Sequence, residues 1–94
     1  MDEIGQVQQA NVVARVVFHE LTPKAALTLF LNLIYGRQRT ADLLDLDENT
    51  VKKRAQRAKK ELKKHHPNHS VESLLIVRLL TQLLKVTELS KKED

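Results

Sequence analysis

The sequence contains no cysteine, only two glycines and two prolines, and three aromatic residues in 94. Without cysteine the chain has no disulfide, no thiolate metal site and no thiol nucleophile, which is compatible with a reducing cytoplasm. Binders of single-stranded nucleic acid usually stack unpaired bases on aromatic side chains. With only Phe18, Phe30 and Tyr35 available, single-stranded nucleic acid is not the expected partner.

The sequence also lacks the roughly 20-residue apolar run that a membrane span needs, and it begins without the features of a signal peptide. We therefore expect no membrane partner and a cytoplasmic location, at the nucleoid. There is no glycine-rich phosphate loop, no nucleophile beside a base and no carboxylate pair, so we expect neither catalysis nor a cofactor. A chain of this length suffices for one domain with a modest core, near the size at which oligomerisation often adds needed burial.

What the sequence does contain is concentrated positive charge. The formal net charge is +4, and the run from Val51 to Lys64 carries eight Lys or Arg against one Glu. Such a charge density repels itself unless a polyanion neutralises it. Apolar residues recur through the same run at helical spacing, which predicts a basic helix with one buried stripe, made of Val51, Ala55, Ala58 and Leu62. Double-stranded DNA is the partner that this helix predicts.

A short helix and a tight turn precede the basic helix within residues 39–62. Asp47 is a good N-cap for the second helix, and Leu46 in the turn supplies an apolar side chain between the two helices. Upstream, Thr22 and Pro23 form a helix start with a capping side chain and a tolerated proline. The pattern predicts a helix-turn-helix.

Two more helices and a tail complete the expected architecture. Ser70 caps a final helix to about Leu89. Residues 1–20 place apolar side chains on one side of a helical wheel, which predicts an amphipathic helix that packs on the domain or pairs with a partner. We thus expect an all-α fold: a domain of about four helices at 21–90, an extra N-terminal helix at 1–20 and a charged tail at 91–94.

A set of residues in this order resembles two known families that share one fold. Leu21-Thr22-Pro23, Ala41, Leu44, Leu46 and Thr50-Val51-Lys52 are similar to the LuxR-type helix-turn-helix domain. Region 4 of bacterial sigma factors is similar in a second set, which is Thr50-Val51-Lys52 with Arg54, Arg57, Ala58 and Leu62. The resemblance covers about residues 21–84. The chain departs from the family pattern at Asp45, where a turn glycine is usual, and at Thr40, where isoleucine is usual.

The resemblance implies that the first part of the basic helix enters the major groove. It places Lys52, Lys53 and Gln56 against base edges, with Asn49 in the first turn as a further reader of adenine. Other cations are expected to contact the phosphate backbone. The full predicted DNA-binding set is Asn49, Thr50, Lys52, Lys53, Arg54, Gln56, Arg57 and Lys60, with Arg37 and Arg39 at the start of the short helix before the turn, which we call the scaffold helix. The alternative is a merely solvated basic face.

The last helix is more apolar than a lone surface helix. Its apolar residues between Leu75 and Val86 span an arc of about 200°, twice the roughly 100° of an ordinary amphipathic helix. LuxR-type domains typically dimerise through their fourth helix, and the match of residues 71–75 to that helix implies a homodimer. The expected interface residues are Leu75, Leu79, Leu83 and Val86. In the alternative, the N-terminal helix covers the surplus within one chain.

Three histidines invite a metal site, but the spacing argues against one. Pro67 interrupts any helix between His65 and His69, so the two do not share the i, i+4 face of a helical two-histidine site. No carboxylate cluster accompanies them. We expect no metal, and a loop at this position.

The sequence therefore predicts a sequence-specific, double-stranded DNA-binding transcriptional regulator that acts as a homodimer. Three alternatives remain open, two of them involving a protein partner. One is a sigma-region-4-like module that also contacts RNA polymerase; the other is a protein-interaction module whose basic helix holds an acidic partner, such as another regulatory protein. RNA binding is the weakest alternative. If these 94 residues are the whole protein, its activity would be set by abundance, dimerisation or another protein.

Overall fold

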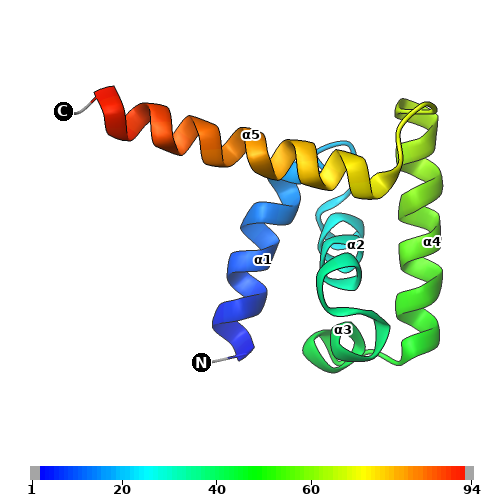
Figure 1. Cartoon of the computed structure of the whole chain (residues 1–94). Helices are drawn as coiled ribbons and strands as arrows, with labels where there is room; N and C mark the ends of the chain where they lie inside the picture. Colours follow the sequence, from blue (N-terminus) through cyan, green and yellow to red (C-terminus); the bar gives the residue numbers. More distant parts are fainter. Residues whose placement is uncertain (1–2, 93–94) are drawn as a thin grey trace.

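The computed structural model describes the backbone of residues 3–92 and the side chains of residues 5–85, and this part contains five helices and no strand (Figure 1). The predicted all-α class is confirmed. The helices are α1 (Glu3–Val17), α2 (Pro23–Tyr35), α3 (Arg37–Leu44), α4 (Glu48–His65) and α5 (Val71–Lys92). No helix in the described part is long and apolar enough to cross a lipid bilayer.

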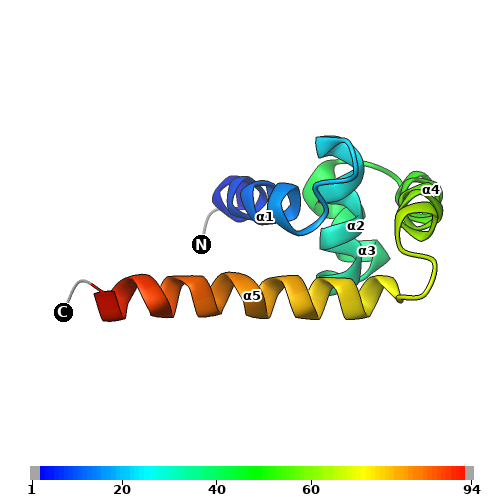
Figure 2. The ribbon, with the colours of Figure 1, turned by 90° about the horizontal axis from the view of Figure 1, so that it is seen from above.

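Helix α2 is the centre of the fold, with α1 on one side and α4 on the other in both views (Figures 1 and 2). It begins as predicted: the Ala25 N–H donates to Thr22 Oγ1 at 3.3 Å, and Pro23 occupies the first turn. It ends at Gly36, whose φ of 86° is easy only for glycine. Its buried side chains, which touch helices on several sides, are Ala26, Thr28, Leu29, Phe30 and Leu31.

The turn between α3 and α4 shows why Asp45 can stand where the resembling families have a glycine. Asp45 has φ 56° and ψ 48°, in the left-handed region. Aspartate adopts this conformation more readily than most residues, because its short polar side chain can bond locally. The turn is closed by the Leu46 N–H, which donates to the Ala41 carbonyl at 2.9 Å.

Thr40 is fully buried although its side chain is polar. Its hydroxyl donates to the Gly36 carbonyl, one helical turn earlier, at 2.7 Å. A buried hydroxyl is tolerated when it is hydrogen-bonded, so threonine can stand where the resembling families place isoleucine.

Helix α1 packs its small apolar side chains against α2. Ala14 and Val17 are fully buried, as is Phe18 directly after the helix, and Ala10 lies at the edge of the same core. The N-terminal helix is therefore part of this chain's own core.

Helix α5 begins in the core and then leaves it. Ser70 caps it as predicted, with the Ser73 N–H donating to Ser70 Oγ at 3.1 Å. Its first turns bury Val71, Leu74 and Leu75, and its later part extends past α1, away from the other helices (Figures 1 and 2). The helix continues to Lys92, so the prediction that it ends near Leu89 is wrong. The end of the predicted tail, residues 93–94, lies outside the described residues.

Candidate nucleic-acid interface

Helix α4 is anchored by its buried stripe and by its N-cap. Val51, Ala55, Ala58 and Leu62 are all buried, which confirms the predicted stripe. The N-cap of α4 is Asp47. Its carboxylate accepts one hydrogen bond from the Thr50 N–H at 2.8 Å and one from the Thr50 hydroxyl at 3.2 Å. These two bonds lower the pKa of Asp47.

The capping bonds give Thr50 a structural position. The resemblance predicts a DNA contact here, yet the side chain is half-buried and its hydroxyl is bonded to Asp47. The side chain therefore holds the start of α4 and does not project from it. A hydroxyl used in this way has no free donor for a phosphate.

Four polar residues of α4 share the face opposite the buried stripe. Asn49, Lys53, Gln56 and Lys60 recur every three or four residues, and all four are exposed. The structure thus brings together three predicted base readers, Asn49, Lys53 and Gln56. Lys60 lies with them, although the sequence predicts that it contacts the phosphate backbone of DNA. Lys52 is exposed too, but it lies about 100° around the helix from Lys53. We name the set Asn49, Lys53, Gln56 and Lys60 the outward face of α4.

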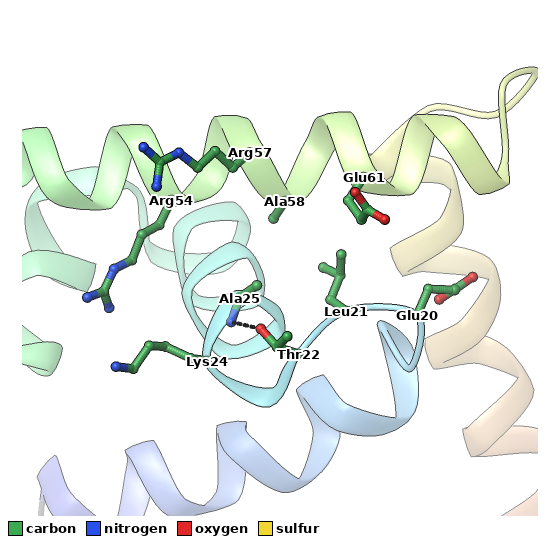
Figure 3. Close-up of a pocket in the computed structure, with 9 residues that line it drawn as sticks. All are labelled: Glu20, Leu21, Thr22, Lys24, Ala25, Arg54, Arg57, Ala58 and Glu61. Carbon is green, nitrogen blue, oxygen red and sulfur yellow. Dashed lines mark hydrogen bonds between the residues drawn. The ribbon is translucent and has the colours of Figure 1, made fainter.

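The other flank of α4 carries Arg54 and Arg57 and faces the beginning of α2. Both arginines line a groove that also includes Lys24, a residue absent from the predicted set (Figure 3). Sequence reasoning misses Lys24 because it lies on a different helix, 30 positions before Arg54. The signal that was present is a cation directly after the Thr-Pro helix start.

The positive charge of α4 is largely unneutralised. Among the described residues, no carboxylate forms an ion pair with Lys53, Arg54 or Arg57. Glu61 is the helix's own acidic residue within the basic run, and it pairs at the far end, with Lys64 at 3.5 Å and with His65 at 3.9 Å. The ion pairs of α4 thus lie at its C-terminal end, and Lys53, Arg54 and Arg57 belong to its earlier part.

Arg37 and Arg39, the remaining predicted phosphate contacts, lie in the first half of α3 and are exposed. They belong to α3, whereas the outward face is formed by α4. Their contact with DNA stays a prediction.

The predicted dimer residues need correction. Leu75 is buried, and Leu79 is half-buried against the same core as α1, because α1 covers that side of α5. Leu83 is exposed as expected, and the side chain of Val86 lies outside the described residues. The exposed apolar face of α5 lies on the opposite side, and we name it the α5 outer face: Ile76, Val77, Leu80, Leu83 and Leu84.

A partly buried ion-pair cluster fixes α5 to the rest of the molecule. The Arg78 guanidinium donates to both oxygens of Glu20 at 2.7 Å and to the Val17 carbonyl at 2.7 Å. His66, at the end of α4, brings its Nε2 to 2.5 Å from Glu20 Oε2. The bidentate guanidinium, helped by His66 and opposed by burial, holds the pKa of Glu20 far below its usual range. The hydrogen bonds to Glu20 in turn raise the pKa of Arg78.

The histidine-rich loop carries no metal-like arrangement. Among the described residues, no group of three or more His, Cys, Asp or Glu side chains is placed to hold a metal ion. His66 contacts Glu20 and Arg78, and its ring lies 6.4 Å from that of His65 and 6.3 Å from that of His69, centre to centre. The role that the structure gives His66 is to join three segments of the chain.

Comparison with models of known protein families gives no match for this chain, and searches of curated proteins and of solved structures give no significant match. The likeness to LuxR-type and sigma-factor domains therefore rests on the residues of this chain alone.

Proposed function

We propose that the protein is a sequence-specific, double-stranded DNA-binding transcriptional regulator, with α4 as its recognition helix. The observation that carries the proposal is the outward face of α4, in which Asn49, Lys53, Gln56 and Lys60 are all exposed. The helix is held to the body by its buried stripe, so these side chains project from a rigid support.

The chemistry of this face suits base edges in the major groove. An α-helix fits the groove, which is about 12 Å wide in B-DNA. An amide such as that of Gln56 or Asn49 pairs with adenine, and an ammonium such as that of Lys53 donates to guanine. The other cations of α4 supply the phosphate contacts that position the helix without reading sequence.

The dimer is part of the same proposal. The five side chains of the α5 outer face are each more than half exposed, from 53% for Leu80 to 65% for Leu84. Contiguous apolar surface of this kind on a small domain marks an interaction site. We propose that a second copy covers it, since a dimer aligns two recognition helices on two half-sites about one turn of DNA apart.

Selection from a pool of random duplex DNA, followed by sequencing, tests the function directly. The proposal expects an enriched sequence with two related half-sites whose centres are about 10 base pairs apart. Recovery of sequences no different from the starting pool would contradict it. In that case the basic helix would serve an acidic protein partner instead.

A further inference from the structure

A groove of about 380 Å³ lies between the beginning of α2 and the middle of α4 (Figure 3). Its floor is apolar, formed by Leu21, Ala25 and Ala58, and its walls carry five charged side chains. Those side chains are Glu20, Lys24, Arg54, Arg57 and Glu61.

The two ends of the groove differ in charge. In Figure 3 the two glutamates lie at one end, toward α5, and the three cations at the other. Both glutamates are already paired: Glu20 with Arg78 at 2.7 Å, and Glu61 with Lys64 at 3.5 Å. The net charge available to a ligand is therefore positive and lies at the end of Lys24 and Arg54.

Lys24 and Arg54 face the same space from opposite walls. Both also line a second, adjoining cavity of about 280 Å³ over Leu46 and the end of α3. No carboxylate of the described residues forms an ion pair with either side chain. Two like charges across an apolar floor repel each other, and an anion placed between them converts the repulsion into two attractions.

We propose that a DNA backbone phosphate occupies the cationic end of this groove, held by Lys24 from α2 and by Arg54 from α4. This inference rests on the proposed function and adds a second element to the interface. DNA is favoured as the source of the phosphate because Arg54 and Arg57 flank the outward face of α4, and backbone strands run along both sides of a helix in the major groove. Arg57, which lines the same groove, contacts the same DNA strand.

A phosphate held in this way would set the depth and the tilt of α4 in the major groove. A single helix can rotate about its own axis, whereas a phosphate held between two helices fixes that rotation. The phosphate carries no sequence information, so this interaction should strengthen binding to every duplex alike.

Lys24→Ala is the first test, with Arg15→Ala as the matched control. Arg15 is an exposed cation on α1, on the other side of α2 from α4. We expect Lys24→Ala to weaken binding about tenfold on selected and random duplex alike, as removal of one charged hydrogen bond does. The slope of log K against log salt should become shallower by about 0.9 for each phosphate that the variant no longer neutralises. Arg15→Ala should change neither quantity.

A double-mutant cycle then tests whether the two cations share one phosphate. Lys24→Ala, Arg54→Gln and the double variant are titrated with the same DNA. If they share the phosphate, the double variant loses less affinity than the product of the two single losses, because each single substitution already disrupts the shared interaction. Losses that simply multiply would overturn the shared site.

Lys24→Glu gives a readout that needs no DNA. A glutamate facing Arg54 replaces repulsion with attraction, so its Tm should equal or exceed that of the wild type while DNA binding falls further than in Lys24→Ala. A lower Tm than that of Arg15→Glu would overturn the argument that the cations repel. Wild-type protein that binds no duplex would refute the proposed function, whereas normal DNA binding by Lys24→Ala would refute this inference alone.

Discussion

The guanidinium of Arg78 holds the carboxylate of Glu20 through two hydrogen bonds of 2.7 Å, although the two residues lie 58 positions apart. Parallel bonds of this kind are stronger and more directional than single ones. They connect α5 to the loop between α1 and α2, and His66 adds the end of α4 to the same carboxylate. Together with the buried start of α5, Glu20 therefore helps to fix the direction of α5 relative to α4.

Replacing Arg78 with methionine should destabilise the protein by about 2 to 3 kcal/mol, because Glu20 would lose its main partner while remaining partly buried. Urea denaturation followed by circular dichroism measures the change. Arg15→Met, at an exposed site, should alter stability by less than about 0.5 kcal/mol. Equal stability of the two variants would show that the cluster contributes little.

The same cluster predicts how stability depends on pH. The folded-state pKa of Glu20 lies below its ordinary value of 4.5, so the contribution of this group is fully present above pH 4.5 and is lost as pH falls toward the folded-state pKa. Wild type should be more stable than Glu20→Gln at pH 7, and the difference should narrow below pH 4.5. Unfolding curves at pH 7, 5, 4 and 3 measure it, and a constant difference would contradict the assignment.

Binding to duplex DNA should depend strongly on salt. If some six phosphates are neutralised per dimer, log K falls against log salt with a slope near −5, by the rule of about −0.9 per phosphate on B-DNA. A fluorescence anisotropy titration at several salt concentrations measures the slope. An affinity that barely changes with salt would argue against DNA as the partner of α4.

Substitutions in α4 should separate the residues that recognise bases from those that contact the phosphate backbone. Lys53→Ala or Gln56→Ala, on the outward face, should cost about 1 to 3 kcal/mol on the selected sequence and little on random duplex. Arg57→Ala, on the flank, should weaken both alike. Lys60→Ala tests which role follows from position, because the sequence predicts that Lys60 contacts the DNA backbone, whereas the residue lies on the outward face with the predicted base readers. Equal losses on both DNAs for all these variants would mean that a different face meets the bases.

The α5 outer face should tolerate charge in the monomer but not in the dimer. Leu83 is 63% exposed, so Leu83→Glu should leave the helical circular dichroism unchanged and yield a monomer by sedimentation. Leu79→Glu, half-buried against the core, should destabilise the fold instead. Thr81→Glu is the control, an exposed α5 residue outside the outer face. Wild type that sediments as a monomer at tens of micromolar would rule out the dimer.

The parts of this fold that are predictable from sequence are those set by neighbouring residues. Thr22, Asp47 and Ser70 cap their helices as expected, because a capping bond spans only three residues. The buried stripe of α4 follows in the same way from the period of the helix.

The features that escape prediction depend on contacts between distant segments. The apolar arc of α5 is evident in the sequence, but which half of it α1 covers depends on the packing angle of the two helices. The prediction therefore assigns Leu75 and Leu79 to a partner, although Leu75 belongs to the core and Leu79 packs against it. Lys24 and the Glu20–Arg78 pair are missed for the same reason, since nothing local in the sequence joins them.

The gradual exit of α5 from the core bears on how far apart two copies would place their α4 helices. Leu75 is buried, Leu79 is half-buried, and the described apolar side chains beyond it, Leu80, Leu83 and Leu84, are each more than half exposed. In a dimer built on this helix, the point at which two copies cross sets the distance between their α4 helices. One helical turn is about 5.4 Å, more than the roughly 3.4 Å between base pairs. Under the proposed function, the length of operator that two copies can span would thus depend on the position of a few leucines of α5, which lie outside α4.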